Sequence, residues 1–126
     1  SMKRIYNLGI RPDWWKLCPP RREAWGAIDA LIHERDPYCR GVLLLGLNAP
    51  VESLAAGFAD AAESTTVRGF AVGRTLFIEP AAAWLAGTID DATLVAQARA
   101  AFERMIALWR DGRRTPDQRV KEGAAA

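Results

Sequence analysis

The sequence predicts an α/β fold in which about three strand–helix units with parallel strands form part of a TIM-type βα barrel. Three short apolar segments are each followed by a segment with helical periodicity, and one of the three is continuously apolar while another is mostly so. Strands of that kind are buried on both faces, as parallel strands covered by helices are. The 126 residues, of which 50% are hydrophobic and 25% charged, suit one globular domain.

The first strand is predicted close to the N-terminus. Residues 2–10 have apolar side chains at helical spacing and then a glycine, which is typical of the last turns of a helix. Residues 13–17 (DWWKL) have the aromatic content of a short strand. Because alternate residues of a strand share a face, we expect Lys16 to lie beside Trp14 and opposite Trp15.

The second unit begins with the helix that follows this strand. Residues 21–35 carry one apolar stripe, and the proline at 37 ends the helix. We expect Asp29 on its solvated face and His33 at the surface. The stripe consists of Trp25, Ile28 and Ile32, with Ala24 and Leu31 beside them.

Two more strand–helix units follow. Residues 41–47 (GVLLLGL) predict a strand buried on both faces, and a turn ending in Pro50 leads into a helix. Residues 66–74 predict the third strand, in which two glycines indicate close approach of another backbone or a ligand. One side of the helix between these strands consists of Val51, Leu54, Ala55, Phe58 and Ala62.

The C-terminal part is predicted to be helical and then polar. Residues 76–86 predict a short helix that Pro80 interrupts. Asp90 then caps a longer helix that ends at Gly112. We therefore expect residues 1–112 to form the barrel segment and residues 113–126 to form a disordered polar tail.

Three parallel strands leave both sheet edges and one sheet face uncovered. A complete βα barrel needs eight such units and about 250 residues. Either the chain is a segment of a larger barrel, or another chain supplies the missing surface. We accordingly expect a homo-oligomer, or pairing with the missing part of the barrel.

The composition argues against several classes of partner. The net charge of +2 comes largely from basic residues within positions 110–121, so we expect no nucleic-acid interface. No segment approaches the roughly 18 apolar residues of a membrane span, so we expect a cytoplasmic protein without a membrane partner. Cys18 and Cys39 lack metal-binding spacing, so we expect reduced thiols, no metal and no cofactor.

Lys16 is the first candidate for chemistry. A lysine in an apolar strand next to Trp14 and Trp15 would be desolvated, which favours the neutral amine that attacks a carbonyl to form a Schiff base. Alternatively, Lys16 lies past the strand end and extends into water. The pattern leaves both interpretations open.

A second candidate site follows the other two strands. Amides after Gly73 at a helix start, with Arg74 and Thr75, can hold a phosphate. Gly46 and Asn48 end the neighbouring strand and can line the same pocket. The alternatives are a surface arginine and a helix-opening turn without a ligand.

Three segments, YNLGIRPDWWKL, DPYCRGVLLLGLNAP and VRGFAVGRTLF, carry a family resemblance. Together they resemble the aldolase-like domain fused behind the sugar kinase in bacterial 5-dehydro-2-deoxygluconokinases of myo-inositol catabolism. The resemblance extends from about Tyr6 to about Trp109. That domain is similar to class I tagatose-bisphosphate aldolases, whose fold is a βα barrel.

The resemblance implies roles for both candidates. The Schiff-base lysine of those aldolases lies in a K-V-E-x-P motif, to which Lys16 and the four residues after it correspond, with Cys18 in place of the acid. Their phosphate-binding motif is G-R-x-x-aromatic, which residues 73–77 match. The implied ligand is a phosphorylated keto sugar acid. Most of the barrel and the kinase domain are absent, so we expect the isolated chain to be incomplete.

These observations favour two functions. The chain is a segment of an aldolase-like sugar-phosphate domain, with Lys16 forming the imine and Gly73 and Arg74 holding the phosphate. The alternative is a non-catalytic sugar-phosphate-binding or oligomerisation domain, in which Lys16 has no chemical role.

Overall fold

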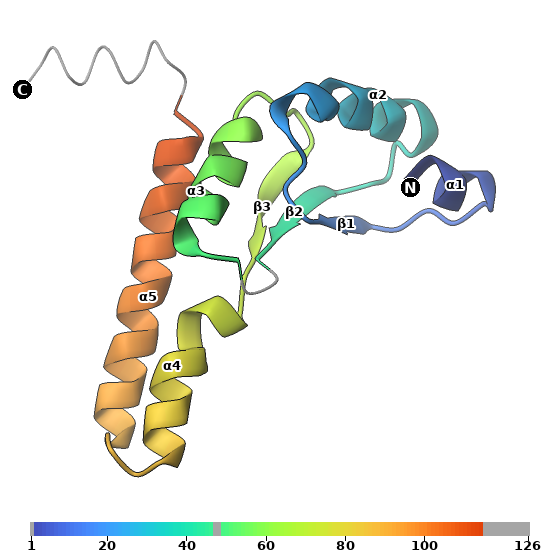
Figure 1. Cartoon of the computed structure of the whole chain (residues 1–126). Coiled ribbons are helices and arrows are strands. Elements are labelled where there is room, and N and C mark those ends of the chain that lie inside the picture. Colours follow the sequence, from blue (N-terminus) through green and yellow to red (C-terminus); the bar gives the residue numbers. More distant parts are fainter. Residues whose placement is uncertain (1, 47–48, 115–126) are drawn as a thin grey trace, which may run out of the picture.

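The computed structural model describes residues 2–46 and 49–114 and shows a three-stranded parallel sheet with helices, which is an α/β fold (Figure 1). The strands lie in the order β1-β2-β3, as in the chain. This confirms the predicted fold class and is consistent with part of a βα barrel, where successive strands are also neighbours. The elements are α1 (Met2–Asn7), β1 (Trp14–Leu17), the 3-10 helix η1 (Arg22–Ala24), α2 (Trp25–Arg35), β2 (Gly41–Leu45), α3 (Val51–Asp60), β3 (Val67–Ala71), α4 (Arg74–Leu85) and α5 (Asp91–Gly112).

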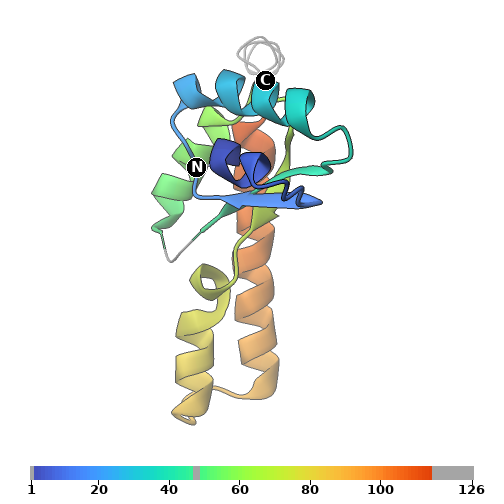
Figure 2. The same ribbon diagram turned by 90° about the vertical axis from the view of Figure 1, so that its right-hand side faces the viewer.

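Helices α1, α2, α3 and α5 supply the core that covers one face of the sheet. Trp15 of β1 meets Tyr6 of α1 with ring centres 5.4 Å apart. At the other edge, Phe70 of β3 packs against Phe58 of α3 and Trp109 of α5. Figures 1 and 2 show these helices around the sheet. Helices on one face and strands in sequential order fit a barrel wall better than a doubly wound sheet, whose two faces are both covered.

The other face of the sheet is open among the described residues. Lys16 and Trp14 are exposed on it, whereas Trp15 on the covered face is buried. The predicted distribution of these three side chains between the two faces is therefore confirmed. Lys16 pairs with Leu43, which in turn pairs with Gly69, so the open face also carries small and aliphatic side chains.

Two glycines let helices approach other segments closely. An added Cβ at Gly57 of α3 would lie 2.5 Å from Cβ of Pro19, which precedes η1. An added Cβ at Gly112 would lie 2.8 Å from Cβ of Phe58. The prediction that α5 ends at Gly112 is confirmed, and the same residue also allows α5 to approach α3.

The start of α4 differs from the prediction. Arg74 is the first residue of this helix and not the last of a strand, because β3 ends at Ala71 and Gly73 is the N-cap. The predicted break at Pro80 was also wrong, since α4 continues to Leu85 with the proline inside it. Proline removes one helical hydrogen bond, and Figure 1 shows α4 changing direction along its length.

Asp29 of α2 is an anchor and not a solvated side chain. Its carboxylate accepts hydrogen bonds from the Ser64 and Thr66 hydroxyls and from the Thr65 amide. These residues lead into β3, so Asp29 ties α2 to the N-terminal edge of the sheet. The prediction that Asp29 is solvated was wrong, because the helical pattern of α2 does not show that a loop distant in sequence places hydrogen-bond donors against this face.

The beginning of the predicted tail has defined contacts. Arg113 donates a hydrogen bond of 2.7 Å to the Ala61 carbonyl, and its guanidinium lies 5.3 Å from the centre of the Trp109 ring. The disorder predicted for the remainder of the tail concerns residues 115–126, which lie outside the described residues. Among residues 2–46 and 49–114, no helix combines the length and hydrophobicity needed to cross a bilayer.

Candidate functional site

The carboxyl ends of β2 and β3 meet at one edge of the sheet. Leu45 and Ala71, the last residues of the two strands, are paired. Directly after them, an added Cβ at Gly46 would lie 3.0 Å from Cγ1 of Val72, so a side chain at position 46 would press on the neighbouring chain. The predicted site residue Asn48 lies outside the described residues.

The α4 N-terminus faces this edge with an exposed arginine. Gly73 provides no side-chain cap, and only its carbonyl takes part in the first turn, accepting from the Leu76 amide at 2.8 Å. Arg74 is exposed, and within residues 2–46 and 49–114 no hydrogen bond or ion pair engages its guanidinium. The first helical amides and an exposed guanidinium therefore lie together, an arrangement that attracts anions.

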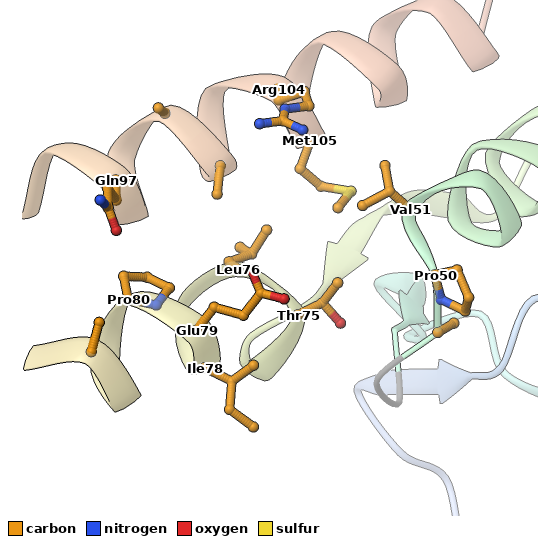
Figure 3. A pocket seen from close by; sticks show the side chains of 14 residues that line it. Pro50, Val51, Thr75, Leu76, Ile78, Glu79, Pro80, Gln97, Arg104 and Met105 are labelled. Carbon is orange, nitrogen blue, oxygen red and sulfur yellow. The ribbon is translucent and has the colours of Figure 1, made fainter. Parts of the chain in front are cut away.

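Thr75 lines a cavity of about 800 Å³ between α4, α5 and the start of α3 (Figure 3). Its hydroxyl oxygen is buried and has no hydrogen-bond partner among the described residues. The α5 side of the cavity carries Arg104 and Met105, and Pro50 and Val51 close it at α3. A buried hydroxyl without a partner leaves a donor and acceptor available for a ligand or water.

Lys16 does not line this cavity. It lies on the open face of β1, and by register it is level with Gly69 of β3. Two strand spacings, about 10 Å, separate β1 from β3 across the sheet. The structure thus brings Gly46, Gly73, Arg74 and Thr75 to one edge and places Lys16 on the adjoining face.

The other reactive side chains lie apart from this edge. Cys18 is an exposed free thiol just after β1, and Cys39 is a half-buried free thiol before β2. Burial raises the pKa of the Cys39 thiol. His33 is exposed on α2, as predicted. Within the part of the chain that the structure describes, no cluster of His, Cys, Asp and Glu side chains is suited to hold a metal ion.

The sequence interpretation missed the α5 wall of the cavity. Gln97 and Arg104 line it seven residues apart on one face of α5, and Glu79 lines it from α4. That spacing is visible in the sequence. The spacing indicates a cavity wall only when α4 and α5 are known to lie side by side, and that arrangement depends on the turn between them.

A comparison with protein families matches nearly the same residues as the fold described above. A family model described as "Uncharacterized protein conserved in bacteria (DUF2090)" matches residues 1–113. The chain belongs to this family. The DUF2090 match includes all the helices and strands described above and every residue of the candidate edge. Searches of curated proteins and of solved structures found no significant match.

Proposed function

We propose that this DUF2090 chain binds a phosphorylated keto sugar acid at the edge formed by Gly46, Gly73, Arg74 and Thr75. It would do so as a segment of an aldolase-like sugar-phosphate domain associated with 5-dehydro-2-deoxygluconokinase in inositol catabolism. The proposal rests on the Arg74 guanidinium, which none of the described residues engages in a hydrogen bond or ion pair, beside the uncapped first turn of α4. A doubly charged phosphate suits a cation next to helix N-terminal amides.

Thr75 supports the same assignment. Its hydroxyl, which has no hydrogen-bond partner among residues 2–46 and 49–114, lies one residue after Arg74 in the first turn of the same helix. Binding of a ligand oxygen there would satisfy a buried polar group that the described residues leave unpaired. A ligand that reaches from the turn into the cavity would therefore gain a hydrogen bond at little cost in reorganisation.

Lys16 is proposed as the group that reacts with the ketone. Its amine attacks the carbonyl carbon, and the resulting carbinolamine loses water to give an imine. The position of Lys16 on the open face supports this role, since in a barrel that face is the interior wall. The neighbouring Trp14 presents an apolar surface on the same face.

Phosphate binding is tested by calorimetric titration with inorganic phosphate and with a phosphorylated keto sugar acid. Arg74→Ala should weaken both by about 10-fold or more, the value of a charge-assisted hydrogen bond. Arg99→Ala is the matched control, because Arg99 is an exposed arginine paired with Glu103 on α5. Equal affinities of the wild type and Arg74→Ala would refute the phosphate site.

The imine is tested separately by borohydride reduction in the presence of the keto sugar acid. A stable adduct on Lys16, absent in Lys16→Ala, is expected. One observation favours the non-catalytic alternative: the cavity beside Thr75 does not include Lys16. If Lys16→Ala binds phosphate normally and the wild type forms no adduct, the chain is a binding domain without aldolase chemistry.

A further inference from the structure

The α4–α5 hairpin stands away from the sheet. In both Figure 1 and Figure 2, α4 and the first half of α5 extend beyond the strands as a two-helix arm. None of the 12 residues of α4 is fully buried, although most of this helix is apolar. A helix that is apolar around most of its circumference is normally covered on several sides. In the described structure, α5 is the helix that packs against α4, and it covers only one side of it.

Large, partly exposed apolar side chains occur at heptad spacing on both helices of this arm. Phe77 and Trp84 lie seven residues apart on α4, and Val95 and Phe102 lie seven residues apart on α5. These four residues define the hairpin face. They are 46%, 42%, 64% and 47% exposed, respectively, and none of them lines the cavity between the helices. Seven-residue spacing on two antiparallel helices is the pattern by which helices pack against further helices.

Two polar pairs lie next to residues of the hairpin face. The Trp84 indole nitrogen donates to Asp91 Oδ1 at 2.7 Å, so burial of this ring leaves no unsatisfied donor. Arg99 and Glu103 form an ion pair of 2.8 Å beside Phe102. Residues 80–89 contain no charged side chain. An apolar centre with a paired polar rim is the organisation of protein interfaces.

The area of the hairpin face fits a second copy of the chain. Together with the exposed Leu85 at its margin, it presents about 450 Å² of apolar side-chain surface per copy. A stable interface buries about 800 Å² per partner, of which a little over half is apolar. Two such faces packed about a twofold axis would supply the apolar part of one standard interface.

We propose that two copies of this chain associate through their hairpin faces and form an antiparallel four-helix bundle from the two α4–α5 arms. Each arm contributes two helices, and the four-helix bundle is the usual way in which paired helical hairpins bury apolar faces. The proposal does not depend on phosphate binding, because the cavity beside Thr75 opens on the other flank of α4 and α5.

The test is light scattering coupled to size-exclusion chromatography, with the wild type and three variants that each add one negative charge. The wild type should elute with twice the mass of the chain. Val95→Glu, within the hairpin face, should yield a monomer. Ala96→Glu, an exposed neighbour on the outer side of α5, and Trp14→Glu, on the open face of the sheet, should remain dimeric.

Circular dichroism separates dissociation from unfolding. The monomer formed by Val95→Glu should retain a helical spectrum, because Val95 is exposed in the single chain. If that variant unfolds, Val95→Gln, which carries no charge, replaces it in the same assay. A wild-type monomer at high protein concentration would overturn the proposal. So would a dimer that Trp14→Glu dissociates and Val95→Glu does not.

Discussion

The indole nitrogen of Trp15 donates a hydrogen bond of 2.8 Å to the hydroxyl of Tyr6 inside the core. The two rings also meet edge to face, so a single pair joins α1 to β1 through an apolar and a polar contact. Burial raises the pKa of the Tyr6 hydroxyl, which therefore remains protonated and neutral. This pair holds the strand that carries Lys16.

Tyr6→Phe should destabilise the protein by about 1–3 kcal/mol, because it leaves the buried Trp15 donor without a partner. The measurement is urea unfolding followed by circular dichroism. Tyr38→Phe is the control, since Tyr38 is 85% exposed. Loss of its hydroxyl should change the free energy of unfolding very little. Equal stabilities of the two variants would show that the Tyr6–Trp15 hydrogen bond does not contribute to the free energy of unfolding.

Gly57→Ala should destabilise the protein by about 1–3 kcal/mol through overpacking against Pro19. The matched change Gly26→Ala in α2 meets no atom within 4 Å. It should stabilise by about 0.5–1 kcal/mol, because alanine favours helices more than glycine does. Opposite signs in thermal unfolding are the expected result, and a stabilising Gly57→Ala would contradict the close packing of α3 on Pro19.

Asp29→Asn should lower stability at neutral pH by about 1–3 kcal/mol, because an amide nitrogen cannot accept the hydrogen bonds that the carboxylate accepts. Burial alone would raise the pKa of Asp29, but the hydrogen bonds from Thr66, the Thr65 amide and Ser64 outweigh it and hold the pKa below its ordinary value.

The pH dependence of that effect has a definite sign. A depressed folded-state pKa contributes stability that is fully present above the unfolded value of about 3.9. This contribution is lost as pH falls through the lower folded-state pKa. The stability difference between the wild type and Asp29→Asn should therefore shrink below about pH 4. Glu52→Gln, at an exposed position of α3, is the matched control for replacing a carboxylate by an amide.

Thr75→Val should separate stability from binding. The variant removes a buried hydroxyl that has no partner among the described residues, so the ligand-free protein should be as stable as the wild type or slightly more stable. Its affinity for the phosphorylated keto sugar acid should fall. A loss of stability without a change in affinity would mean that the hydroxyl is satisfied within the protein and does not serve a ligand.

The three strands were predictable because a buried strand can be recognised from the apolar residues within a short stretch of sequence. The continuous apolar run at β2 and the alternation around Lys16 both reflect sheet faces that a short window can show. The start of α4 was less predictable. Gly73 and Arg74 fit either the end of a strand or the start of a helix, and only the hydrogen bond from the Leu76 amide to Gly73 decides between them.

Contacts between distant segments were beyond the sequence patterns. Asp29 looks like a surface residue until the loop at Ser64, 35 residues later, folds against it. The cavity wall at Arg104 likewise depends on the turn that brings α5 back along α4. For the site itself, the sequence indicated the edge residues Gly46, Gly73, Arg74 and Thr75, but not that the cavity would exclude Lys16.

The two free thiols differ in a way that is useful for spectroscopy. Cys18 is exposed two residues after Lys16, whereas the raised pKa and partial burial of Cys39 leave little reactive thiolate at neutral pH. A maleimide fluorophore should therefore label Cys18 first, without any engineered cysteine. The dye would lie at the carboxyl end of β1, where its emission would report ligand entry and changes of solvent at the open face of the sheet.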